Sequence, residues 1–197
     1  MQQLRVQYWR EIVQVNLKDL VFVDETGSNL AMTRRYARSS KGSRAYDDAP
    51  YQRGNNLTVI GAMALRGLVG EMTLPGATDG LAFKTYVTQV LVPNLWPGAC
   101  VVMDNLPAHK VAGIREGIEA VGATVVYLSP YSPDFSPIEN CWSKVKEFLR
   151  ALFGTNLCRA RPSHHGCSCY GDHQGHYRLV HSLLLLYSTQ LRTAVAV

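Results

Sequence analysis

The stretch "LVFVDETG" (residues 20–27) runs from apolar residues directly into two adjacent carboxylates. Its apolar half predicts a buried β-strand over 20–24, and Asp24 and Glu25 stand at the end of that strand. Burying a carboxylate is costly unless it is paired, protonated or bound to a metal. A lone aspartate at a strand end is more often a turn or cap residue than a ligand, so a functional interpretation requires further acids at the same place.

Four more apolar segments predict strands, and their connections predict how the strands pair. The segments are "NLTVIGAMAL" (56–65), "LVGEMTL" (68–74), "ACVVMDN" (99–105) and "TVVYL" (124–128). A tight turn at Arg66-Gly67 joins the first two as an antiparallel hairpin, whereas helical crossovers make the later strands parallel. The sequence therefore predicts an α/β fold with a mixed five-stranded sheet, three strands antiparallel and then two parallel, flanked by helices.

Helical periodicity accounts for the segments between the later strands. The turn "GATDG" (76–80) is expected to cap a helix over 80–96 that Pro93 ends or kinks, and Gly122 is expected to end a second helix. The predicted helices are 1–18 (with a linker), 80–96, 108–122 and 137–152.

Composition restricts the class of protein. The 197 residues suffice for one domain, and the net charge of +5 with a pI near 9.0 favours an anionic partner such as nucleic acid. No segment reaches the roughly 20 apolar residues of a membrane span, and the polar start is unlike a secretory signal. Cys100 and Cys141 lie in apolar runs typical of reduced core thiols, so a cytoplasmic, nucleoid-associated location without membrane contact is expected.

A second strand repeats the pattern of the first, because "CVVMDN" also ends in an acid, Asp104. Ligands of open α/β sheets gather at the carboxyl ends of strands, near the point where the topology switches. The strand over 20–24 changes there from antiparallel to parallel neighbours. Asp24 and Asp104 are therefore expected on adjacent strands, close enough to share a divalent cation.

A third candidate acid is Glu139, in "SPDFSPIENCWSKVKEFLR". A structural explanation competes here, since Ser136 as N-cap, Pro137 at the first helical position and Glu139 at the third form a capping-box pattern. Glu139 also lies beside the apolar stripe of its helix, from where it can point to the end of the sheet. This feature alone favours the cap.

Taken together, "FVDETG", "VVMDNLPAHK" and "YLSPYSPDFSPIENCWSKVK" resemble the three catalytic blocks of DDE transposases, in the bacterial insertion-sequence branch of the mariner superfamily. The 34 residues between Asp104 and Glu139 equal the separation that names one subgroup. The resemblance covers residues 5–150. It implies a ribonuclease H-like fold and a catalytic triad of Asp24, Asp104 and Glu139.

The resemblance also implies a chemistry. Two Mg²⁺ or Mn²⁺ ions about 4 Å apart activate an attacking oxygen and stabilise the leaving oxygen of a phosphodiester. Asp24 would bridge the ions, with Asp104 and Glu139 on one ion each. Water would nick the DNA strand at the element's end, and the released 3′-hydroxyl would attack target DNA.

For three residues next to the triad, the sequence leaves a functional and a structural role open. Glu25 is either a partner behind the ligands or an outward-facing salt-bridge residue, with the structural role favoured. Asn105 and His109 either touch phosphate or a ligand water, or are a helix-capping Asn and an ordinary surface His, with the second alternative favoured.

A long polar segment, 27–54, carries more basic than acidic residues. A basic loop beside a metal–phosphate site is expected to contact the DNA backbone, although such loops are usually just solvated. Tyr36 and Tyr46 could stack on unpaired bases. The predicted DNA-contacting residues are Arg34, Arg35, Arg38, Lys41 and Arg44.

Both ends of the chain depart from the family. Family members begin with helix-turn-helix modules, whereas only a helix and linker (1–18) precede the catalytic domain (19–152), so another polypeptide supplies the module or the chain is truncated. The tail (153–197) holds five of the six histidines and three of the five cysteines, without the spacing of an ordinary zinc site. A frameshift is the preferred hypothesis, since "SHHGCSCYGD" (163–172) shifted by one nucleotide can encode a helix.

The sequence thus predicts a transposase catalytic domain, intact or defective, acting on terminal-repeat and target DNA, with a second copy of itself and a separate helix-turn-helix polypeptide as candidate partners. Two alternatives remain open. One is an inactive DNA-binding remnant that interferes with intact transposase. The other is a ribonuclease H-like nuclease acting on RNA–DNA hybrids.

Overall fold

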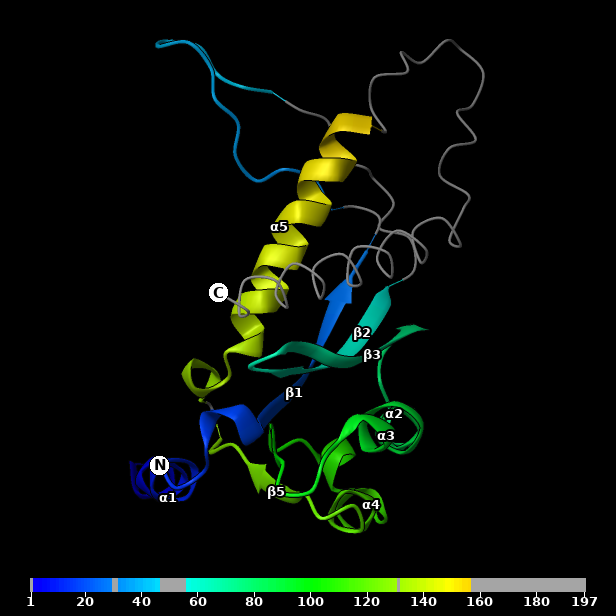
Figure 1. Ribbon diagram of the computed structural model, residues 1–197. Coiled ribbons are helices and arrows are strands. Elements are labelled where there is room, and N and C mark those ends of the chain that lie inside the picture. The colour runs from blue at the N-terminus through cyan, green and yellow to red at the C-terminus, as the bar shows by residue number, and fades with distance from the viewer. Residues whose placement is uncertain (1, 30–31, 47–55, 131, 157–197) are drawn as a thin grey trace.

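The computed structural model describes residues 2–29, 32–46, 56–130 and 132–156. Within them, one five-stranded sheet has the order β3-β2-β1-β4-β5. β1 pairs antiparallel with β2 and parallel with β4, and the outer strands continue each orientation. The predicted mixed sheet is therefore confirmed, with β1 at its centre (Figure 1). The strands are β1 Leu20–Ser28, β2 Leu57–Ala64, β3 Gly67–Pro75, β4 Cys100–Met103 and β5 Thr124–Tyr127.

β1 is longer than the predicted strand over 20–24. The antiparallel partner β2 follows it along its whole length, up to the pair Ser28↔Leu57. Asp24 and Glu25 therefore lie inside the strand and not at its end. A strand continues for as long as a neighbouring strand supplies backbone hydrogen bonds, even where its apolar run has ended. The parallel partner β4 is shorter and pairs only as far as Val23↔Met103.

One face of the sheet is covered by α2 (Gly80–Tyr86), α3 (Val92–Asn94) and α4 (Ile114–Glu119) (Figure 1). Phe83, Tyr86, Leu91, Ile114 and Ile118 bury completely against alternate residues of the central strands.

The predicted helix over 80–96 is interrupted by a π-helical stretch, Val87–Leu91, just before Pro93. Proline lacks an N–H donor, and such a bulge lets the chain continue past it. Asp79 caps the start as expected, because its Oδ1 accepts from the Ala82 N–H at 2.7 Å.

The predicted helix over 108–122 is also two pieces, a 3₁₀ turn at Pro107–Lys110 and α4. Gly113 separates them with φ +92°, a left-handed conformation that glycine adopts without strain. Gly122, with φ +79°, follows α4 as the predicted stop.

The other face of the sheet is covered by α1 (Gln2–Ile12) and α5 (Ile138–Asn156). α1 is held to the loop before α5 by an Arg5–Asp134 ion pair and by Tyr8, whose ring stacks on Phe135 at 5.2 Å. The sequence predicts an apolar stripe of Ile138, Trp142, Val145, Leu149 and Leu152 on this helix. α5 buries the first four, and the side chain of Leu152 lies outside the described part of the structure.

α5 continues four residues past the predicted domain end at 152, and the rest of the predicted tail, 157–197, lies outside the described residues. In the part of the chain that the structure describes, no helix is both long and apolar enough to cross a membrane.

The packing of α5 on the sheet depends on a glycine. A Cβ added at Gly61 would lie 2.7 Å from the Trp142 ring, which is buried and cannot swing away, whereas a Cβ at Gly27 on β1 would meet nothing within 4 Å. We expect Gly61→Ala to lower the free energy of unfolding by about 1–3 kcal/mol through overpacking. Urea denaturation measures this, with Gly27→Ala as the matched control; equal midpoints for the two variants would contradict it.

Candidate active site

The register of the two parallel strands places two aspartates side by side. The last parallel pair of β1 and β4 is Val23↔Met103, and the next residue on each strand is an acid, Asp24 and Asp104. Both are partly buried. The structure thus brings together the two acids that the sequence pattern matched, although only Asp104 stands at the end of its strand.

Strand alternation separates Asp24 from Glu25. Successive side chains of a strand point to opposite faces. Val21 and Val23 pack with the α2–α4 layer, so Glu25 lies on that face. Phe22 packs against the α5 and α1 side, so Asp24 faces the layer that contains Glu139.

Asp24 is the electrostatic centre of the group. Its pKa is raised to about 7, mainly by burial and additionally by the charges of Glu139, Glu25 and Asp104, against a lowering hydrogen bond from the Glu25 backbone. Carboxylates that act on one another in this way compete for ionisation. At neutral pH Asp24 is therefore poised to hold a proton until a cation offsets the surrounding negative charge.

Glu139 lies in the first turn of α5 and is exposed. Its N–H donates to the Ser136 carbonyl at 3.2 Å. No side-chain hydrogen bond joins Ser136 and Glu139, both of which the structure describes, so the capping box that the sequence favoured is not formed. The Glu139 carboxylate is consequently left to act on Asp24.

The Asp104 carboxylate is oriented by its neighbours. Oδ1 contacts His109 Nδ1 and accepts from the Leu106 N–H at 3.3 Å. Among the described residues, Oδ2 has no hydrogen-bond partner. One oxygen is thus fixed by the protein while the other is left available, the arrangement typical of a ligand carboxylate with a supporting second layer.

His109 is completely buried and joins two acids. Its ring stacks on Phe83 with centroids 3.9 Å apart, and Nε2 lies 3.1 Å from Glu25 Oε1 while Nδ1 contacts Asp104. Burial lowers its pKa, but the hydrogen bonds and charges of Asp104 and Glu25 outweigh this and raise it to about 9. The imidazolium therefore partly neutralises the acids around it.

Three expectations for these neighbours were wrong. His109 is not a surface residue, because the 3₁₀ turn that begins at Pro107 folds it back between the sheet and Phe83. Glu25 does not face outward in a surface salt bridge, since its side chain is 17% exposed and pairs with that buried ring. Asn105 caps no helix: the N-cap of the following turn is Leu106, and no side chain caps that turn.

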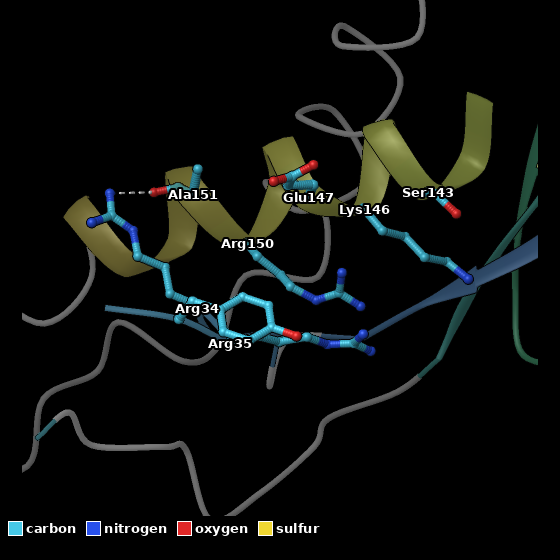
Figure 2. A pocket seen from close by; sticks show the side chains of 8 residues that line it. Arg34, Arg35, Ser143, Lys146, Glu147, Arg150 and Ala151 are labelled. Atoms are coloured by element: carbon cyan, nitrogen blue, oxygen red, sulfur yellow. Dashed lines mark hydrogen bonds between the residues drawn. The ribbon is translucent and has the colours of Figure 1, made fainter. Parts of the chain in front are cut away.

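The described part of the predicted basic loop is exposed and without helix or strand over 34–46. Arg34 donates to the Ala151 carbonyl at 3.3 Å, which ties the start of the loop to α5 (Figure 2). No contact within the described residues joins Arg38, Lys41 or Arg44 to the acids. Tyr36 and Tyr46 are 90% and 87% exposed, so their rings are free to stack.

The carboxylates of Asp24, Asp104 and Glu139 act on one another but do not surround a common point as the ligands of a bound metal ion would. Among the described residues, no group of three or more His, Cys, Asp or Glu side chains is arranged to hold a metal ion. The arrangement is nevertheless chemically suited to hard divalent cations, which take carboxylate oxygens, because it concentrates negative charge around one protonated acid.

Comparison with known proteins places this arrangement in a family. The model of the DDE superfamily endonuclease family matches residues 19–156. A search of curated proteins gave no match.

Solved structures share the fold. A pre-cleavage Mos1 transpososome is 17% identical with a TM-score of 0.56, over 98% of this chain and 60% of that one. The Mos1 mariner paired-end complex with Mn gives the same values, and the one with Mg is 15% identical with a TM-score of 0.55, over 98% and 60%. The chain thus spans less than two thirds of the length of these transposases.

The likeness confirms the ribonuclease H-like fold that the resemblance implied. Because the family match covers most of the chain, including β1, β4 and the acid-bearing turn of α5, the protein belongs to the DDE superfamily endonucleases.

Proposed function

We propose that the chain is the catalytic domain of a transposase, which cleaves DNA strands at the ends of a mobile element and joins the 3′-hydroxyl to target DNA. The observation that carries this proposal is the position of Asp24 and Asp104 directly after the last pair of the β1–β4 ladder, with Glu139 acting on Asp24 from α5. The similar Mos1 structures are described as transpososome, paired-end and strand-transfer complexes, which supports DNA ends and target DNA as partners.

Two Mg²⁺ or Mn²⁺ ions, held by Asp24, Asp104 and Glu139, would activate the attacking oxygen and stabilise the leaving oxygen. Mos1 complexes with Mn and with Mg support this choice of ions. Two observations fit such binding. Oδ2 of Asp104 has no hydrogen-bond partner among the described residues, and the raised pKa of Asp24 shows that its negative charge is not offset within the protein.

The residues of this chain have distinct tasks in that scheme. Asp24 must release its proton to become a ligand. His109 and the Leu106 N–H hold Asp104 in place, and Glu25 holds His109. Asn105, which is exposed beside Asp104, remains a candidate for contact with phosphate.

Asp104→Asn tests the proposal. The amide keeps the shape of the side chain but removes a ligand charge worth several kcal/mol in the transition state, so we expect Mn²⁺-dependent nicking of terminal-repeat DNA to fall by about a hundredfold or more. Labelled DNA resolved on denaturing gels measures it, with Asp79→Asn, at a helix cap far along the chain, as the control.

Three outcomes of the same assay would contradict the proposal. Unchanged nicking by Asp104→Asn would remove this acid from the mechanism. Absence of nicking by the unaltered chain, with DNA binding retained, would favour an inactive remnant, and faster cleavage of RNA–DNA hybrids than of DNA would favour a nuclease.

Asp24 should destabilise the ion-free protein at neutral pH. Its folded-state pKa of about 7 exceeds the ordinary value of 3.8, so the folded state binds the extra proton and stability falls as pH rises between these values. We expect Asp24→Asn in EDTA to raise the Tm at neutral pH by about 2–8 °C, corresponding to ~1–2 kcal/mol after discounting for solvent. Asp79→Asn is again the control, and an equal or lower Tm for Asp24→Asn would contradict the interpretation.

His109 should lower stability in the same direction but in a higher pH window. Its raised pKa means that its contribution to stability is full below about 6.5 and is lost as pH rises through about 9. Urea midpoints measured in EDTA across this window should fall for the unaltered chain and stay nearly level for His109→Gln. Parallel curves would show that the imidazolium does not hold the two acids.

A further inference from the structure

The tight turn between β2 and β3 carries an arginine that is held in place at the surface. Arg66 stacks over the Trp96 ring, with its guanidinium carbon 4.2 Å from the ring centroid, and donates to the Asn94 carbonyl at 3.3 Å. Trp96 is held in turn by Asp19, whose Oδ1 accepts from the indole N–H at 3.0 Å. The guanidinium is thus oriented before any partner binds, which lowers the entropy that binding costs.

Open cavities lie on both sides of this arginine, and Arg66 lines both. The first, of about 350 Å³, has Lys18, Leu65 and Trp96 in its wall. The second, of about 380 Å³, has Leu68 and Val69. Small-molecule sites span roughly 300–1,000 Å³, so each of these two cavities has room for only one or two side chains.

The two cavities lie at the end of the sheet opposite to the candidate active site. Val21 pairs with Ala64, so the turn that follows Ala64 lies beside the start of β1, whereas Asp24 follows the last pair of β1 with β4. At a rise of about 3.3 Å per residue, the four residues from Leu20 to Asp24 span about 13 Å. A short segment bound beside Arg66 is therefore separate from the acids.

The charges around Arg66 favour a carboxylate as its partner. Among the described residues, no salt bridge neutralises Arg66 or Lys18, and Asp19, the acid beside them, is hydrogen-bonded to Trp96. Arginine presents a fork of N–H donors that matches a carboxylate, and the Asn94 carbonyl occupies only part of it. Two cations beside one acid leave a small positive charge, which suits a single carboxylate better than a polyanion such as DNA.

Apolar groups flank the arginine on both sides. Leu65 is 55% exposed and the Trp96 ring is half-buried in the wall of the first cavity, while Val69 is half-buried in the wall of the second. In an extended peptide, residues two positions apart lie on the same side, about 7 Å from one another. A carboxylate placed on Arg66 therefore directs the side chains two residues before and after it toward the two cavities.

We propose that Arg66 and its two cavities bind an extended segment of a partner protein. One carboxylate side chain of that segment pairs with Arg66, and an apolar side chain two residues away on each side enters a cavity. Burial against Leu65 and Trp96 supplies affinity, the charge pair fixes the register, and Lys18 attracts further acids at that end. The inference goes beyond the proposed function and does not depend on it.

A double-mutant cycle tests the charge pair. The probe is a fluorescein-labelled peptide with blocked ends, Ser-Leu-Ser-Glu-Ser-Leu-Ser, and a second peptide has Gln in place of Glu. Binding is measured by fluorescence anisotropy in EDTA. We expect the unaltered chain to bind the Glu peptide about tenfold more tightly than the Gln peptide, because a hydrogen-bonded charge pair is lost. Arg66→Gln should bind both peptides equally, at the weaker affinity.

Two controls accompany the cycle. Arg115 also lies over an aromatic ring, 5.5 Å from the centroid of Tyr127, but is already paired with Glu119, so Arg115→Gln should bind like the unaltered chain. A third peptide, with Ser in place of both Leu residues, should bind the unaltered chain about tenfold more weakly, because it leaves the cavities empty.

Several results would overturn the inference. Equal affinity of the unaltered chain for the Glu and Gln peptides would remove the charge pair, and this comparison needs no variant, so it decides the question even if Arg66→Gln unfolds. Equal losses in Arg66→Gln and Arg115→Gln would show that only net charge matters. Undiminished binding of the peptide without Leu would remove the cavities. Binding of a labelled DNA duplex that falls in Arg66→Gln, while peptide binding does not, would assign the turn to nucleic acid.

The peptide assay separates this inference from the proposed function, because it involves neither DNA cleavage nor metal ions. Nicking by the unaltered chain without a preference for the Glu peptide would leave the function standing and remove the peptide site. A preference for the Glu peptide that depends on Arg66, without nicking by the unaltered chain, would leave a peptide-binding site on an inactive protein.

Discussion

The parallel pairing of β1 with β4 is the constraint on which the site depends. It ends at Val23↔Met103, and the first unpaired residue on each strand is an aspartate. A shift of one residue would turn one carboxylate to the opposite face, because side chains alternate along a strand. The antiparallel ladder with β2 continues past this point and keeps Asp24 in extended backbone where β4 no longer supports it.

The negative charges around Asp24 are only partly balanced within the protein. Several acids converge on Asp24, and the protein supplies one buried imidazolium, His109, on the opposite face of the strand. That cation partly neutralises Glu25 and Asp104. Among the described residues no salt bridge pairs Asp24 or Glu139, and Lys146 acts on Asp24 only through its charge. The uncompensated charge is the physical reason to expect cations from solution at this place and not elsewhere on the sheet.

Sequence patterns predicted the sheet and the neighbouring positions of Asp24 and Asp104 because both depend on local signals, buried apolar runs and turn residues. Glu139 was singled out only by the family resemblance, since its local pattern favoured a helix cap. Features set by tertiary partners were not predictable in this way. β2 lengthened β1, and Gly113 with its positive φ broke a helix whose periodicity was otherwise continuous. The role of His109 depends on which residues face it, and a single sequence carries no direct signal of that.

α5 carries an acid at its first turn and cations two and three turns later, on one continuous helix anchored by Trp142 against Gly61. Because α5 is one continuous helix, Glu139 at its start and the basic residues further along are expected to move together. Any sliding or rotation of α5 would therefore displace Glu139 and the basic residues of the helix together. The position of this acid relative to Asp24 is set by how Trp142 seats against Gly61.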